Sequence, residues 1–141
     1  MKTPILYFVG TSLLGLVSGL AFATSTPSHG ETDQSMASCL SGPNAAQSAG
    51  MNDCIVKAAE ESSRQMDSVY QRLRARLDPT SRKLLEASQK SWIAYRKEEL
   101  AFAHGPWRQS SGTFEQLDIA ALRLHELQDR TRILEGYLKG M

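Results

Sequence analysis

Apolar side chains recur at alternating spacings of three and four residues along three long segments of this chain, and no other feature constrains the fold as much. This spacing places the side chains on one stripe of an α-helix. The strict alternation that would indicate half-buried strands is not sustained anywhere in the sequence. The sequence therefore predicts an all-α fold.

Three helices are expected, over about 52–77, over about 79–103, and from Thr113 to Gly140. Their boundaries are predicted from turn and capping residues. These are Asn52 and Asp78 as N-caps, Pro79 at a first helical position, Gly105 and Pro106 beyond the second helix, Thr113 with Gln116 as a capping box, and Gly140 as the final stop.

The three apolar stripes form the expected core. Helices of about 25 residues are roughly 37 Å long. Their similar lengths and short connections favour an antiparallel three-helix bundle, or a long helical hairpin with a third helix. The stripes are Val56, Ala59, Ser63, Met66, Tyr70, Leu73 and Leu77; Leu85, Ser88, Trp92, Tyr95, Glu99 and Phe102, widened by Leu84, Ile93 and Leu100; and Leu117, Ala120, Leu124, Leu127, Thr131, Leu134 and Leu138.

Residues 1–23 have the features of a cleavable signal peptide. Lys2 precedes an apolar run from Pro4 to Leu20, and Ala21-Phe22-Ala23 resembles a cleavage site. The run is shorter than the roughly 20 residues of a membrane-spanning helix. We therefore expect cleavage, no stable membrane insertion of the mature chain, and a periplasmic or secreted location.

The mature chain is expected to consist of a flexible N-terminal arm at 24–50 and a helical domain at 51–141. Cys39 and Cys54 are the only cysteines, and an even count in an oxidising compartment favours a disulfide. The bridge would clip the arm to the first helix and stabilise the fold by roughly 3 kcal/mol. A reactive thiol pair is the alternative, but the C-x-x-C spacing is absent.

Composition and motifs argue against several function classes. The chain has 16 basic and 15 acidic residues, and loss of Lys2 with the leader leaves it neutral, which disfavours a general nucleic-acid binder. Phosphate-loop, G-x-S-x-G and H-E-x-x-H motifs are missing, and the cysteines and histidines lack zinc-site spacing. We expect no enzyme activity, no cofactor and no metal.

Charge is concentrated within residues 72–90, which hold six basic and two acidic residues. Such a run is either a solvated helix end or a patch for an acidic partner or anionic polymer. The sequence leaves both interpretations open.

Trp92, Tyr95 and Arg96 share one side of the second helix. Trp92 and Tyr95 continue the apolar stripe and are expected in the core, with Arg96 paired to an acid on a neighbouring helix. An exposed recognition surface is the alternative, because Trp, Tyr and Arg are frequent interface anchors.

His104 and Trp107 flank Gly105 and Pro106, outside the helical periodicity. Loops mounted on a rigid scaffold often carry binding residues, whereas covering the end of the bundle is the structural alternative. Together with the nearby Glu98 and Glu99, these two residues form the expected partner-contact patch.

The segment Leu85–Arg96 contains Gln89, Trp92, Tyr95 and Arg96 and is similar to the run L-x-x-A-Q-x-x-W-x-x-[FY]-R, with Ser88 between Ala87 and Gln89. With Cys39 and Cys54, the segment Met66–Leu73, and Arg130 with Leu134, it resembles the lysozyme inhibitor LprI-like family of small exported bacterial proteins. The family's second cysteine pair is absent, with Leu100 and residues such as Ala121 in those regions.

The resemblance implies an exported helical protein that binds and inhibits a lysozyme sterically, with no catalytic residues. It implies structural roles for Gln89, Trp92, Tyr95 and Arg96. The alternative is a periplasmic interaction or assembly protein without lysozyme activity. The sequence does not specify the oligomeric state.

Overall fold

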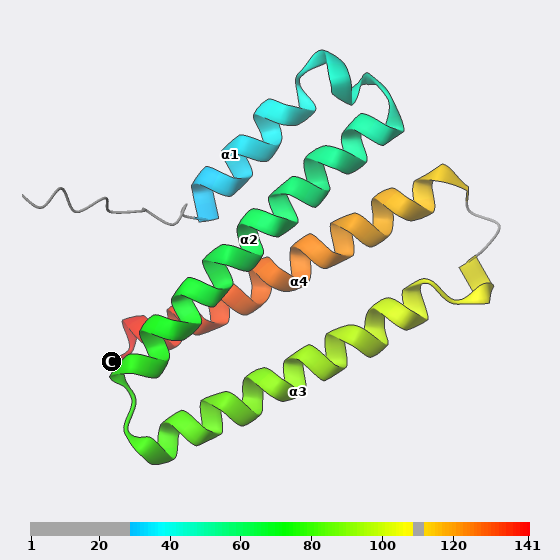
Figure 1. Ribbon diagram of the computed structural model, residues 1–141. Helices are drawn as coiled ribbons and strands as arrows, with labels where there is room; N and C mark the ends of the chain where they lie inside the picture. The colour runs from blue at the N-terminus through cyan, green and yellow to red at the C-terminus, as the bar shows by residue number, and fades with distance from the viewer. Residues whose placement is uncertain (1–28, 109–111) are drawn as a thin grey trace, which may run out of the picture.

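A computed structural model describes residues 29–108 and 112–141, and the predicted signal peptide lies outside this part of the chain. The described residues contain helices and turns but no strand, so the all-α prediction is confirmed. Figure 1 shows the helices α1 (His29–Leu40), α2 (Ser48–Arg76), α3 (Pro79–Ala103) and α4 (Thr113–Lys139), with short 3₁₀ turns η1 (Pro43–Ala46) and η2 (Pro106–Arg108).

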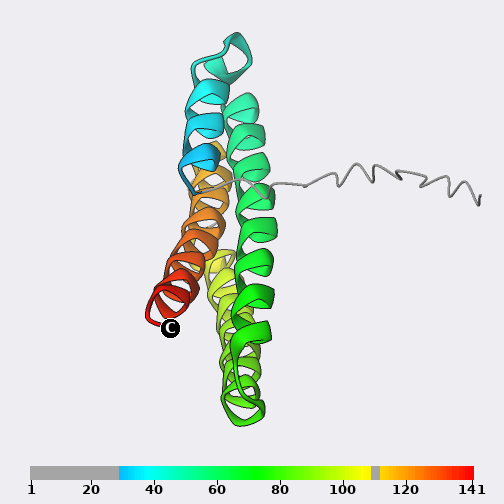
Figure 2. The same cartoon turned by 90° about the vertical axis from the view of Figure 1, so that its left-hand side faces the viewer.

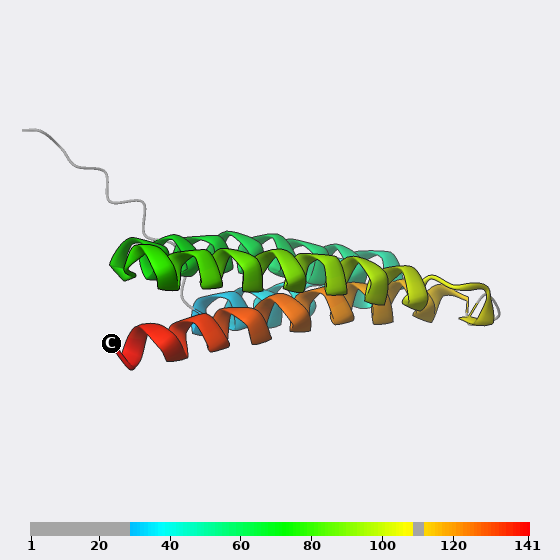
Figure 3. The same cartoon turned by 90° about the horizontal axis from the view of Figure 1, so that it is seen from below.

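The three long helices alternate in direction along the chain, and α1 folds back beside the first half of α2 (Figures 1 and 2). The closest packing is between α2 and α4, whereas the backbone of α3 stays further from both helices. Viewed from below, the helices extend along one common direction (Figure 3). The predicted helical bundle is therefore confirmed, with α1 as an additional helix.

The core lies mainly between α2 and α4. Its centre consists of Met66, Val69 and Leu73 on α2 and Leu127 and Leu134 on α4, with Leu85 contributed by α3. The stripe predicted for α4 is buried from Ala120 to Leu134, and Gly140 caps the helix as expected, donating its N–H to the carbonyl of Gly136. Burial of these aliphatic side chains is the main stabilising contribution to the fold.

Helix α2 begins earlier than predicted. Its N-cap is Gln47, and Asn52, the expected cap, lies inside the helix. A Cβ on Gly50 would collide with the carbonyl oxygen of Asn44, so a residue without a side chain lets η1 pack against the first turn of α2. Tertiary packing of η1 thus sets the helix start, and the local capping pattern missed it.

Residues 29–46 are largely helical, whereas the sequence suggested a flexible arm with no helix before about residue 52. Helix α1 buries Thr32 completely but has few large apolar side chains. The predicted disulfide between Cys39 and Cys54 is present, with the Cα atoms 5.7 Å apart, and joins the end of α1 to α2. This covalent link compensates for the small apolar contact of α1.

Helix α3 has the predicted ends. Asp78 is the N-cap: its carboxylate accepts hydrogen bonds from the backbone N–H groups of Thr80 (2.8 Å) and Ser81 (3.1 Å), and Pro79 occupies the first turn. These bonds, beginning with those from Ser81, lower the pKa of the Asp78 carboxyl. The helix ends at Ala103, as expected.

The buried face of α3 differs from the predicted one. Leu85 and Trp92 face inward, but Tyr95 and Phe102 are 59% and 63% exposed. The widening positions Leu84 and Ile93 are also exposed. The face is rotated because polar residues occupy part of the interior side of α3, as described below.

The structure does not place Thr113 at the N-cap position that the predicted Thr113–Gln116 capping box requires. Helix α4 begins at Thr113, and its N-cap is Gly112, which has φ = 63° and makes no side-chain cap hydrogen bond.

Among the residues described by the structure, no helix combines the length and apolar character needed to cross a bilayer.

Candidate functional site

Polar side chains of the Gln-x-x-Trp-x-x-Tyr-Arg segment join α3 to α4 and α2. The buried Arg130 donates from Nε to Gln89 Oε1 (2.9 Å) and from Nη2 to Ser88 Oγ (3.2 Å). Gln89 in turn donates from Nε2 to the sulfur of Met66 at 3.2 Å. A chain of hydrogen bonds thus crosses all three long helices.

Trp92 lies at the centre of the same cluster. The guanidinium carbons of Arg96 and Arg130 lie 5.5 and 5.7 Å from its ring centroid, within the range of cation–π attraction. Arg96 also pairs with Glu126 on α4, with 3.1 Å between Nε and Oε2. The expected pairing of Arg96 with an acid on a neighbouring helix is therefore confirmed, whereas the expected core position of Tyr95 is wrong.

Burial controls the ionisation of this cluster. It raises the pKa of the Glu126 carboxyl, and the hydrogen bond from Arg96 opposes that rise. Burial also lowers the pKa of the Arg130 guanidinium. Glu126 Oε1 is buried without a hydrogen-bond partner in the described part of the chain. These groups interact mainly with one another, so the cluster stabilises the interface of α3 with α4.

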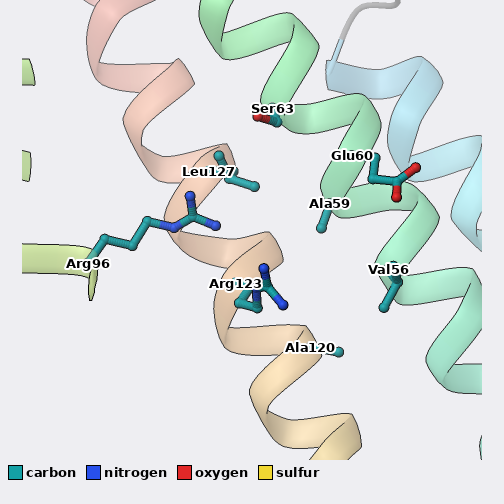
Figure 4. A pocket seen from close by; sticks show the side chains of 8 residues that line it. All are labelled: Val56, Ala59, Glu60, Ser63, Arg96, Ala120, Arg123 and Leu127. Carbon is teal, nitrogen blue, oxygen red and sulfur yellow. The ribbon is translucent and has the colours of Figure 1, made fainter. Parts of the chain in front are cut away.

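A pocket of about 250 Å³ lies beside this cluster, and Figure 4 shows its side chains. Arg96 extends from α3 toward α4, and the Arg123 side chain projects from α4 (Figure 4). This volume is smaller than that of a typical pocket for a drug-sized ligand. The lining residues are Val56, Ala59, Glu60, Ser63, Arg96, Ala120, Arg123 and Leu127.

The connection between α3 and α4 presents aromatic side chains to solvent. Trp107 is 60% exposed and stacks on Phe102 with 5.1 Å between ring centroids. Its Nε1 donates a 2.8 Å hydrogen bond to the carbonyl of Phe102. Arg108 lies 5.7 Å from the Trp107 ring and forms an ion pair with Asp118 on α4. The indole is thus exposed and yet held in place.

Gly105 makes this arrangement possible. A Cβ at this position would lie 2.9 Å from both the Phe102 carbonyl oxygen and Trp107 Cδ1. Both contacts are closer than real Cβ atoms adopt, so a larger residue would displace the indole. The Gly-Pro pair, predicted as a helix end, also sets the position of Trp107.

The four predicted contact residues are distributed unevenly around this connection. His104 is the exposed C-cap of α3 and Trp107 is exposed. Glu98 is exposed and precedes Phe102 by four residues, so both lie on one face of α3. Glu99 is half-buried, and its negative charge helps to raise the pKa of the Glu126 carboxyl.

We call Glu98, Phe102, His104, Trp107 and Arg108 the tip surface. Sequence reasoning missed Phe102 because it assigned this residue to the core stripe. Its position four residues after Glu98 and directly before the helix end could have suggested an exposed aromatic group. In the first turn of α4, Phe114 is 75% exposed as well.

Charge is divided along the length of the bundle. The half that contains the tip surface, residues 47–62, 91–108 and 112–126, has eight acidic and five basic residues, and α1 adds Glu31 and Asp33. The opposite half, residues 63–90 and 127–141, has ten basic and five acidic residues. The nearly neutral chain is therefore strongly dipolar.

These features define a small, disulfide-bonded helical bundle with an exposed aromatic loop. Residues 39–134 match the family model described as lysozyme inhibitor LprI, and the chain belongs to this family. The match is to an inhibitor family and not to an enzyme family. No curated protein matches the chain by sequence.

Among solved structures, the chain is similar to an uncharacterized protein from Burkholderia thailandensis, with a TM-score of 0.69 and 27% sequence identity. The match covers 75% of this chain and 52% of the other, so the chain spans about half the length of that relative.

In the described residues, no group of three or more His, Cys, Asp or Glu side chains is placed to hold a metal ion.

Proposed function

We propose that the protein is exported and inhibits a lysozyme sterically, by placing the tip surface against the enzyme's glycan-binding cleft. Membership of the LprI family is the observation that carries this proposal. The predicted signal peptide and the disulfide support an extracytoplasmic location, because disulfides persist in oxidising compartments.

The exposed aromatic groups favour the tip surface as the contact. Trp and Arg are enriched among the residues that dominate binding energies, and Trp107 and Arg108 are neighbours here. The stacking on Phe102 and the hydrogen bond to its carbonyl hold the indole before any partner arrives. Such preorganisation reduces the entropy lost on binding.

Electrostatics supports the same end of the molecule. Most lysozymes are cationic, and the half of the bundle that carries the tip surface has an excess of acidic residues. Complementary charge accelerates association and favours the correct orientation. Glu98 lies on the tip surface itself, and Glu99 adds negative charge beside it.

An interaction or assembly role without lysozyme activity is a second candidate. It is favoured by large apolar side chains on one face of α3, where Leu84 and Tyr95 are 68% and 59% exposed. Self-association would cover them. The molecular mass in size-exclusion chromatography with light scattering separates the two: a stable oligomer favours assembly, and a monomer leaves the tip surface free.

The direct test is a lysis assay with purified residues 24–141 and lysozymes of the chicken, goose and invertebrate types. We expect saturable inhibition of at least one type. Replacing Trp107 with alanine should weaken inhibition by about ten- to a hundredfold, as expected for an interface hot spot. Tyr137→Ala is the matched control, because Tyr137 has a similar exposure of 58% at the opposite end of the bundle. The absence of binding to all three types would refute the proposal.

A further inference from the structure

The end of the bundle opposite the tip surface has an apolar groove. It lies between the end of α2, the start of α3 and the end of α4, with a volume of about 520 Å³. Its outer rim is exposed: Leu84 is 68%, Tyr137 58% and Met141 61% accessible to solvent. We call this region the basal surface. Its apolar members are Leu73, Leu77, Leu84, Leu85, Tyr137 and Met141.

Arg and Lys residues alternate in the sequence with the residues that line this groove, and two of these cations have structural roles. Arg74 pairs with Glu86, with 2.8 Å between Nε and Oε1. Arg82 donates to the backbone carbonyls of Arg74 (3.3 Å) and Leu77 (3.2 Å) and so caps the end of α2. These contacts explain part of the basic run at 72–90 without any partner.

Four further cations directly adjoin groove residues in the sequence and form no ion pair with the carboxylates that the structure describes: Arg72, Arg76, Lys83 and Lys139. Glu135 lines a shallow pocket with Arg72, Arg76 and Lys139 and offsets part of their charge. The surrounding half of the bundle still has ten basic against five acidic residues. Cations that pair with none of the described carboxylates thus adjoin, in the sequence, the exposed leucine, tyrosine and methionine side chains of the groove.

We propose that the basal surface binds the surface of an anionic phospholipid membrane. Lys and Arg side chains near such a surface are attracted to its negative potential, and adjacent apolar side chains insert at the boundary of headgroups and acyl chains. Tyr137 fits this boundary because its ring is apolar and its hydroxyl is polar. The protein associates peripherally, through side chains at one end of the bundle.

Charge complementarity and exposed aliphatic groups together favour a membrane over a soluble polyanion. A polyanion would bind the cations and leave Leu84 and Met141 in water, whereas a bilayer takes up both kinds of group.

Helix α4 has 27 residues and is about 40 Å long, several times the screening length of about 8 Å at physiological salt. Binding at the basal surface therefore leaves the tip surface free.

Vesicle co-sedimentation of the purified mature chain tests the proposal. We expect binding to vesicles of phosphatidylcholine with phosphatidylglycerol, weakening as salt is raised, and little binding to phosphatidylcholine alone. Lys83→Gln should weaken binding about fivefold, the effect of one cation near an anionic surface. Leu84→Ser should weaken it about tenfold through the lost apolar insertion. Both side chains are exposed, so the variants should fold, and cooperative thermal unfolding checks this.

Matched controls lie on the same helix. Lys97→Gln removes a cation and Ile93→Ser removes an exposed apolar side chain, both away from the groove, and neither should alter vesicle binding. Trp107→Ala should also bind vesicles normally, so a failure of the lysozyme proposal is distinguishable from a failure of this one. The absence of vesicle binding would overturn the proposal. Binding to heparin that is unaffected by Leu84→Ser, without vesicle binding, would identify a soluble polyanion and overturn it as well.

Discussion

Replacing Arg130 with alanine should destabilise the fold strongly, because this guanidinium connects α4 to α3. Arg130 is 7% exposed and donates to Gln89, which is itself 8% exposed. Hydrogen bonds that involve a charged group contribute about 1.5–3 kcal/mol each, and a buried acceptor left without a donor costs about 1–3 kcal/mol. Relief from burying the guanidinium offsets part of this loss.

We therefore expect a net loss of about 3 kcal/mol in the free energy of unfolding, from a total of roughly 5–15 kcal/mol for a domain. Urea denaturation followed by circular dichroism measures it. Arg132→Ala is the matched control, because Arg132 lies two positions after Arg130 on the same helix and forms an exposed ion pair with Asp129. This substitution should lower the free energy of unfolding by less than about 1 kcal/mol. The double variant Arg130→Met with Gln89→Leu, which removes both polar partners, should recover most of the lost stability. If Arg130→Ala were as stable as Arg132→Ala, the cluster would not hold α3 in place.

Three other features give testable expectations. Replacing Cys39 and Cys54 with serine should lower the free energy of unfolding, measured by urea denaturation, by roughly 3 kcal/mol. The same change should increase the rate of amide exchange more in α1 than in the other helices. The pKa of Asp78 is lowered in the folded state, so the ionised carboxylate stabilises the fold at pH values above the ordinary carboxyl pKa. This stabilisation is lost as the pH falls through the lowered pKa. Asp78→Asn should therefore flatten this part of the profile of stability against pH. Gly105→Ala should displace Trp107, which would change its fluorescence and weaken lysozyme inhibition without a large change in circular dichroism.

The parts of the fold that local chemistry determines were predictable from the sequence. The stripe of α4 is apolar and buried over most of its length, so periodicity alone located it. Asp78 with Pro79 marked a helix start because both residues act on adjacent backbone groups. The cysteine pairing followed from the count and the expected compartment.

The parts that depend on tertiary contacts were not predictable in this way. The face of α3 is rotated because Gln89 points inward, where Arg130 satisfies it, and a pattern of hydrophobicity excludes such a residue from the interior. The pairing of Arg96 with an acid was expected, but its partner Glu126 was not. Helix α1 was missed because it has few large apolar residues and is held by a disulfide.

The exposed arrangement of the tip surface was only partly predictable for the same reason. Trp107 and His104 were recognisable as loop residues outside the helical repeat, and both are exposed. Phe102 was assigned to the core, and its stacking with Trp107 depends on the turn at Gly105.

The loose attachment of α3 allows this helix to open before the paired helices α2 and α4. Its backbone stays apart from α2 and α4, and a few large side chains and the polar cluster bridge the separation. Segments with few buried apolar contacts open below the free energy of global unfolding, so amide protons in α3 should exchange faster than those in the central turns of α2 and α4. A partner bound at the tip would then slow exchange along the whole of α3, far beyond its own footprint.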